Sequence, residues 1–170
     1  PERIHTQGIR GLDLQDVAIA DKAGYRVKLL GRALRLADGR QAAYVAPHLV
    51  PQDCPVAPVD DVFNAVMIRG NAVGDVMFYG RGAGDLPTAS AVMGDVMDAL
   101  QHRAKRRDLD WSESAELADF AGLSMKWYLR GDFTPPEGSM ELSGGAVIAG
   151  PMTAAQAEKL GAAVLLPVFE

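Results

Sequence analysis

Residues 80–91 read GRGAGDLPTASA and lie between a β-like run and the start of a helix. Glycine at every second position lets the main chain pass where side chains would block it, which is typical of a close approach to another surface or a ligand. Asp85 is expected to cap the helix that follows, and Pro87 suits its first turn. The small residues 88–91 then permit a close neighbour. The stretch therefore predicts a strand, a tight glycine loop and a closely packed helix.

An anion is a common ligand of a glycine loop at a helix N-terminus, but this loop does not suit a phosphate. The carboxylate of Asp85 would repel it, and the spacing matches neither G-x-G-x-x-G nor the P-loop pattern. A neutral, flat, polar group is the better physical fit. A tight loop that docks the helix against another domain fits the residues equally well, so both interpretations stay open at this point.

Composition limits the classes of protein that this chain can belong to. Its 170 residues are 48% hydrophobic, which is enough for a folded core. The net charge of −5 argues against general nucleic-acid binding. Cys54 is the single cysteine, which excludes an internal disulfide and favours a reducing, cytoplasmic setting. No apolar run reaches membrane-spanning length, so we expect no membrane partner.

Hydrophobic periodicity predicts an α+β protein with a mixed, largely antiparallel sheet and packed helices. Helices are expected over residues 12–23, 87–104 and 153–161. Strands are expected over residues 25–36, 41–45, 63–69, 74–79, 126–133, 146–149 and 163–169. Asp13 and Asp16 stand where acidic residues favour a helix start, and Gly24 supplies the stop. Asp38-Gly39 is a strong hairpin signal between two of the strands.

Few residues are arranged as catalytic or metal-binding groups. The three histidines, His5, His48 and His102, lie far apart in the sequence, and none has the spacing of a metal ligand. Lys28 could donate a proton if it were desolvated, but a lysine whose amine reaches solvent is the simpler interpretation. We therefore expect no metal site and no catalytic residue in this chain.

Several segments resemble the middle of homoserine dehydrogenases and follow that family's order over about residues 8 to 100. They are residues 8–9 (GI), 13–24, 25–30 (YRVKLL), 56–66 (VAPVDDVFNAV), 70–74 (GNAVG) and 82–92 (GAGDLPTASAV), continuing to Asp95. The resemblance implies an oxidoreductase that interconverts aspartate semialdehyde and homoserine with NAD or NADP, on the route to threonine and methionine. In that family a Rossmann domain comes first, and a mixed sheet then carries the substrate site and forms the dimer.

The resemblance also implies which residues contact the cofactor, because the family's glycine loop lies beside the nicotinamide. Gly84 is the best candidate, with Gly82, Ala83 and Thr88 as weaker ones. The family's Rossmann domain, substrate-binding carboxylates and catalytic lysines all lie upstream of the segments present here. The resemblance therefore implies a homodimeric fragment that needs its missing N-terminal Rossmann domain and is inactive by itself. The choice between NAD and NADP depends on residues of that domain.

The tail of the chain resembles an ACT domain, a small ferredoxin-like module that senses amino acids. Residues 127–130 correspond to its first strand, and residues 146–170 to its closing strand, helix and strand. The expected helix start is replaced by residues 135–139 (PPEGS), which favours a degenerate module kept for packing or subunit contacts.

The expected organisation follows from these two resemblances. A catalytic and dimerisation region covers residues 1–107, a partly helical connector residues 108–125, and an ACT-like tail residues 126–170. The alternative is a non-catalytic amino-acid-binding or assembly module.

Overall fold

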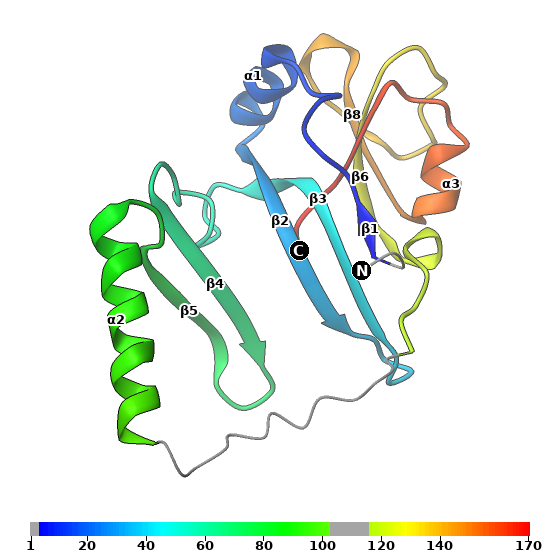
Figure 1. Cartoon of the computed structure of the whole chain (residues 1–170). Coiled ribbons are helices and arrows are strands. Elements are labelled where there is room, and N and C mark those ends of the chain that lie inside the picture. Colours follow the sequence, from blue (N-terminus) through cyan, green and yellow to red (C-terminus); the bar gives the residue numbers. More distant parts are fainter. Residues whose placement is uncertain (1–3, 103–115) are drawn as a thin grey trace. The chain divides into compact units, whose positions relative to one another are not determined.

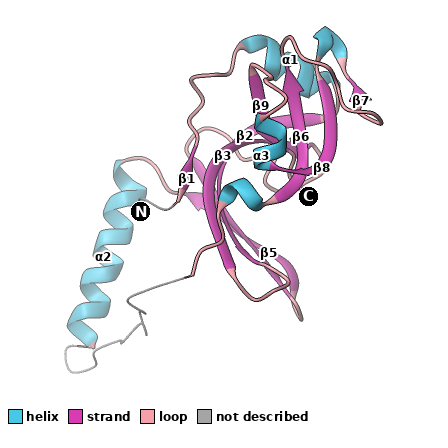
Figure 2. Cartoon of the chain, turned by 90° about the vertical axis from the view of Figure 1, so that its right-hand side faces the viewer, coloured by secondary structure: helices cyan, strands magenta, loops and turns pink. Residues whose placement is uncertain are grey.

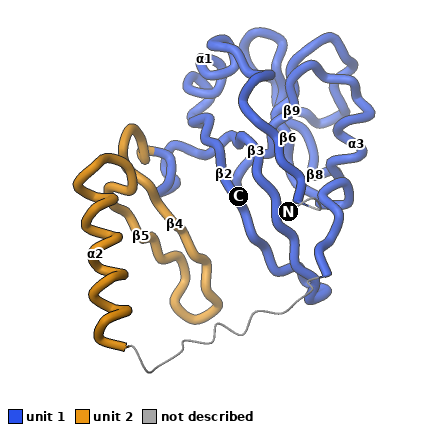
Figure 3. The backbone as a smooth tube through the Cα atoms, viewed as in Figure 1, with its two compact units in different colours: residues 1–57, 114–170 blue, residues 58–113 orange. Residues whose placement is uncertain are grey.

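The computed structural model describes residues 4–102 and 116–170. The chain divides into two compact units, which are coloured separately in Figure 3. Unit 1 combines Pro1–Ala57 with Ser114–Glu170, and unit 2 is Pro58–Glu113. These boundaries differ from those of the expected regions, because residues 1–107 contribute to both units and the tail joins unit 1. The division of the chain into family domains stays a prediction.

A long hairpin forms the first half of unit 1 (Figure 1). Strands β2 (Tyr25–Arg35) and β3 (Gln41–Pro51) pair antiparallel along their full length. The predicted turn at Asp38-Gly39 joins them, and Gly39 adopts the positive φ of +85° that this turn requires. The short strand β1 (His5–Thr6) pairs in parallel with the opposite edge of β3, which gives the order β1-β3-β2.

Strand β3 runs six residues further than the sequence predicts and includes Pro47. The carbonyl oxygens of Val45 and Leu49 face away from β2, since they accept hydrogen bonds from the main-chain N–H groups of Gln7 and Phe169. Backbone groups alternate direction along a strand, so position 47 faces the same way. Its missing N–H group therefore costs no bond to β2, and proline is tolerated.

The tail folds as a four-stranded antiparallel sheet of order β7-β8-β6-β9. Its strands are β6 (Ser124–Arg130), β7 (Met140–Glu141), β8 (Val147–Thr153) and β9 (Val164–Pro167). Helix α3 (Ala154–Glu158) begins at the predicted capping box, where Thr153 and Gln156 bond reciprocally, and lies against β6 and β8 (Figure 2). This is the strand order of a ferredoxin-like fold, with a loop at residues 131–139 in place of its first helix.

Two hydrophobic cores join the hairpin to the tail, one on each face of strand β6. Trp127 and Leu129 lie in a core with Tyr44 of β3, Phe120 of the short helix η1 (Phe120–Gly122) and α3. Tyr128 points to the opposite face, into a core with α1 (Leu14–Lys22) and Leu49. Alternation of side chains along a strand explains this split. Residues 4–57 thus bury their apolar surface against the tail.

Unit 2 is a hairpin followed by a helix. Strands β4 (Phe63–Gly70) and β5 (Gly74–Arg81) pair antiparallel, and α2 (Asp85–Gln101) follows the glycine loop. The expected capping role of Asp85 is wrong: Gly84 is the N-cap, and Asp85 is the first helical residue. An acidic residue still suits that position, because it faces the positive end of the helix dipole. The final predicted helix residues, 103–104, lie outside the described part of the chain.

Every residue of α2 is described, and none of them is buried. Its apolar stripe, including Val92, Met93 and Met97, faces solvent within unit 2. The hairpin is similar, with Val66 and Phe78 exposed. No helix in the described part of the chain is long and apolar enough to span a membrane.

Gly144 provides a test of how closely the tail packs on α1. It has φ of +67°, and a Cβ there would lie 2.9 Å from the Cδ1 atom of Ile19. Gly161 has a similar φ of +74° but no neighbour within 4 Å. We expect Gly161→Ala to lower the free energy of unfolding by about 1 kcal/mol through backbone strain, and Gly144→Ala by about 2 to 3 kcal/mol because overpacking adds to it. Equal losses in urea denaturation would contradict the close packing.

Candidate functional site

The glycines of the loop between β5 and α2 have different structural roles. A Cβ on Gly82 would overlap the side chain of Asn64, so this position is required for packing within unit 2. Gly84 instead has φ of +109°, a conformation that side-chain-bearing residues rarely adopt. The N–H groups of Gly82 and Ala83 donate to the carbonyl oxygen of Val62 at 3.3 and 3.4 Å, which fixes the loop to the start of β4.

Thr88 closes the loop from the first turn of α2. Its hydroxyl donates to the carbonyl oxygen of Gly84 at 2.8 Å, and its N–H group donates to the same oxygen at 3.1 Å. With its proton used in this way, the Thr88 oxygen can accept a hydrogen bond from a ligand. The first N–H groups of a helix have no partner within the helix, and Gly84 offers no side chain to accept from them.

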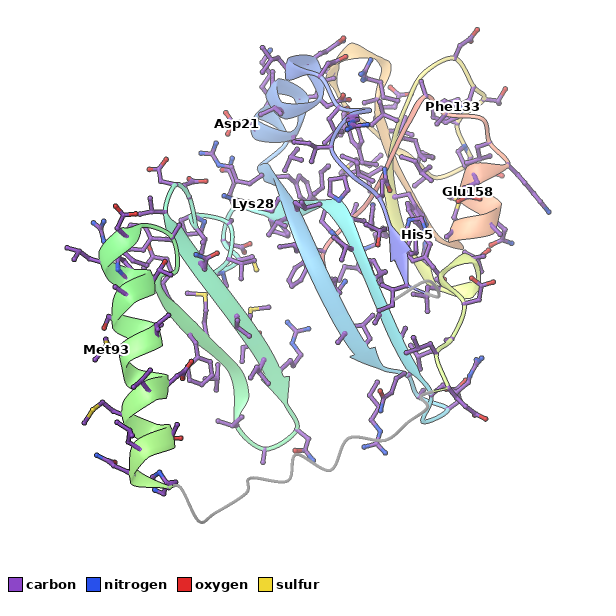
Figure 4. All side chains as sticks on the ribbon, in the orientation of Figure 1. His5, Asp21, Lys28, Met93, Phe133 and Glu158 are labelled. Atoms are coloured by element: carbon purple, nitrogen blue, oxygen red, sulfur yellow. The ribbon has the colours of Figure 1, made fainter. Side chains whose placement is uncertain are left out.

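A shallow, mainly apolar hollow of about 600 Å³ adjoins this loop. It is lined by Gly84, Asp85, Thr88, Ala89, Val92 and Met93. The structure thus brings together two of the predicted cofactor residues, Gly84 and Thr88, whereas Gly82 and Ala83 do not line the hollow. Val92 and Met93 also line the hollow, and sequence reasoning missed both as site residues. Met93, labelled in Figure 4, is 57% exposed.

The chemistry of this hollow suits a flat, neutral group with one apolar face. Donors at the start of α2 can bind a carbonyl oxygen, and the Thr88 oxygen can accept from an amide nitrogen. Val92 and Met93 provide apolar contact for a ring. Asp85 places a carboxylate at the edge, which disfavours a phosphate. The residues present therefore fit the nicotinamide end of a dinucleotide better than its phosphates.

The histidines lie outside this hollow. His48 is completely buried in unit 1, where its Nδ1 donates to the carbonyl oxygen of Ala46 at 2.8 Å and its Nε2 accepts from the Tyr44 hydroxyl at 3.3 Å. His5 stacks on Phe120 with ring centroids 3.8 Å apart. Among the described residues, no group of three or more histidine, cysteine or acidic side chains could hold a metal ion.

A buried charge cluster, which sequence reasoning missed, links α1 to the tail. The Asp16 carboxylate is fully buried and accepts from the Tyr128 hydroxyl at 2.8 Å and from both Nε and Nη2 of Arg130, at 2.5 and 2.9 Å. Arg130 also donates to Asp13 at 2.9 Å. Burial by itself raises the pKa of Asp16, but the hydrogen bonds from Arg130, Asp13 and Tyr128 outweigh burial and lower it. An arginine that ends the apolar run WYL was the available signal.

Two kinds of contact hold α1 on the tail: the charge pair between Asp16 and Arg130, and the apolar contacts of Ile19 and Ala20. Leaving a buried carboxylate without its partner costs about 3 to 5 kcal/mol. Burial of the two apolar side chains on the same face of α1, Ile19 and Ala20, contributes about 2 to 4 kcal/mol. Removal of one partner of the charge pair is therefore expected to destabilise the docked α1 at least as much as loss of the apolar contact.

A family model described as homoserine dehydrogenase matches residues 1–97. The chain belongs to the homoserine dehydrogenase family. The homoserine dehydrogenase of Pseudomonas aeruginosa is 45% identical over 100 residues, which cover 59% of this chain and 23% of that protein. The homoserine dehydrogenase of Corynebacterium glutamicum is 35% identical over 133 residues, 74% of this chain and 30% of that protein.

The crystal structure of a homoserine dehydrogenase from Thiobacillus denitrificans resembles this chain with a TM-score of 0.78 at 26% identity. The match covers 99% of this chain and 48% of that one. The chain therefore spans about half the length of this solved homoserine dehydrogenase, and less than a third of the curated relatives above. The predicted family and the mixed α+β fold are confirmed.

His48 makes the stability of unit 1 depend on pH. Burial lowers its pKa from 6.5 to about 4, with the charge of Arg32 acting in the same direction. The unfolded chain therefore takes up a proton before the folded chain does, and stability falls as pH drops from 6.5 to 4. We expect a loss of about 3 kcal/mol in the free energy of unfolding across this range. His48→Gln, which cannot titrate, should remove most of this slope in denaturant titrations, and an equally steep slope would contradict the assignment.

Proposed function

We propose that this chain is the C-terminal part of an NAD(P)-dependent homoserine dehydrogenase. The complete enzyme would interconvert L-homoserine and L-aspartate 4-semialdehyde on the route to threonine and methionine, in the cytoplasm. Oxidation of homoserine would require a hydride acceptor, which a bound nicotinamide would supply, and a base that takes the hydroxyl proton. The observation that supports this most directly is the family match over residues 1–97 together with the Gly84 hollow.

The part of the enzyme supplied here is one wall of the cofactor site. The cofactor, when bound, supplies the hydride-accepting ring. Gly84 and Thr88 would bind its carboxamide, Val92 and Met93 would exclude water from one side of the ring, and Gly82 and Ala83 would hold the loop in place. We propose that the choice between NAD and NADP is made by the Rossmann domain that the resemblance implies.

We propose that nucleotide binding and proton transfer are carried out by the other half of the complete enzyme. The chain matches about half of a solved homoserine dehydrogenase. The resemblance implies that the family's Rossmann domain and catalytic lysines lie upstream of the segments present here. We therefore propose that the chain by itself is inactive. The exposed apolar side chains of β4 and β5, such as Val66 and Phe78, support a homodimer.

The tail is proposed to be a degenerate ACT-like module with a packing role. Its strand order supports the ACT-like origin, and the loop at residues 131–139 stands where the ligand-side helix would begin. Both faces of its sheet are already covered, one by α1 and the other by α3. A sheet that is occupied on both faces has little surface left for sensing an amino acid.

A chimera tests the proposed activity. In the Pseudomonas aeruginosa enzyme, the 100-residue segment that aligns with this chain is replaced by the corresponding residues of this chain. We expect the chimera to reduce NAD(P)⁺ in the presence of homoserine, and the isolated chain to show no turnover. A chimera that is folded by circular dichroism but inactive would contradict the proposal and favour the alternative, a non-catalytic amino-acid-binding or assembly module.

Substitutions in this chimera test the cofactor residues. Thr88→Val removes the hydroxyl acceptor, so we expect the KM for NAD(P) to rise about tenfold while the KM for homoserine is unchanged. Gly84→Ala should have a similar effect. The matched controls are Ser90→Ala, outside the hollow on α2, and Gly74→Ala, where φ is +72° and no atom lies within 4 Å. Equal kinetic effects of the controls and the test variants would reject the assignment.

A further inference from the structure

Helix α1 is held on the tail by one narrow face. Its buried residues are Asp16, Ile19 and Ala20, which contact the sheet face that carries Tyr128. The opposite side of the helix is open, with Leu14 87% and Val17 45% exposed. The buried contacts of α1 with the tail therefore come from three side chains, one of which is a carboxylate.

Arg130 balances that carboxylate from the last position of strand β6. Its Nη2 atom donates to Asp16 and to Asp13, each at 2.9 Å, and its own side chain is only 18% exposed. Asp13 is the N-cap of α1, and Asp16, the third residue of the helix, is its partner in the capping box. One guanidinium of the tail thus binds both acidic residues that start the helix.

Glycines border α1 on both sides. Gly8 and Gly11 precede it, and Gly24, with φ of +83°, follows it. A Cβ at any of these positions would have no neighbour within 4 Å, so none of the three is needed for packing. Glycines in open surroundings allow the backbone to change direction at both ends of the helix.

We propose that the Arg130–Asp16 pair is a charge latch that decides whether α1 stays docked on the tail. When the latch is closed, the guanidinium of Arg130 balances the charge of the Asp16 carboxylate, and the helix covers Tyr128. Without Arg130, the docked helix would hold an uncompensated buried charge, and Asp16 regains water when α1 moves away as a unit. Leu14 and Val17 form one wall of an apolar hollow, and Val27 and Leu29 of β2 form the other wall. Movement of α1 away from the tail would therefore change the shape of this hollow.

Hydrogen exchange measured by mass spectrometry on the whole chain tests the latch. Arg130→Met keeps the apolar stem of the side chain but removes its charge. We expect amides of α1 to exchange about 100-fold faster, while those of β8 change less than about twofold, since α1 detaches without opening the sheet. The matched control is Lys126→Met, which removes another cation of β6 from an exposed pair with Glu170. The control should leave α1 protected.

A second variant separates the charge effect from lost packing. Asp16→Asn has nearly the same shape but no charge, so adding it to Arg130→Met should restore the protection of α1. Equal acceleration of α1 and β8, an unchanged α1, or no restoration in the double variant would each overturn the latch. If Arg130→Met does not fold, Arg130→Gln carries the same comparison, because it also removes the charge and the forked contact.

Discussion

Strand β6 is buried on both faces, and the rest of unit 1 depends on this arrangement. Trp127 and Leu129 are fully buried on one side and Tyr128 on the other. A strand with two apolar faces must lie between two layers, and the second layer here comes from residues 4–57 of the same chain. The tail is therefore part of the core of the N-terminal region, although more than sixty residues separate the two in the sequence.

Among the described residues, the buried polar side chains Asp16 and His48 both have hydrogen-bond partners in this core. Asp16 accepts from Tyr128 and Arg130, and the ring of His48 has a partner at each nitrogen. Burial costs polar groups their water, and these partners replace it. The pairs also specify which residues meet, because a shifted α1 would leave a buried carboxylate opposite apolar side chains. The unit thus combines apolar contacts with paired polar groups that specify which residues meet.

Unit 2 differs from unit 1 in how much of its apolar surface is buried. Its helix has a regular apolar stripe, yet none of its residues is buried, and the hairpin exposes apolar side chains such as Val66 and Phe78. Exposed apolar surface of this kind is typical of contact regions. The candidate cofactor residues Gly84 and Thr88 lie on this unit. This open hollow is consistent with the proposed role of unit 2 as one wall of a cofactor site.

Sequence signals confined to a few neighbouring residues were sufficient to predict many structural elements of this protein. The Asp38-Gly39 turn, the capping box at Thr153 and the periodicity of α2 predicted their elements correctly, because turns, caps and helix faces depend on residues close in sequence. The family was predicted from several segments that follow its order over about residues 8 to 100, and the motif around Gly84 was the most specific of them. Other features needed the folded chain: the route of β3 through Pro47, the N-cap at Gly84, and the pairing of Asp16 with Arg130. Each depends on a partner or a backbone angle that adjacent residues do not specify, and only tertiary packing brings residues 114 positions apart into contact.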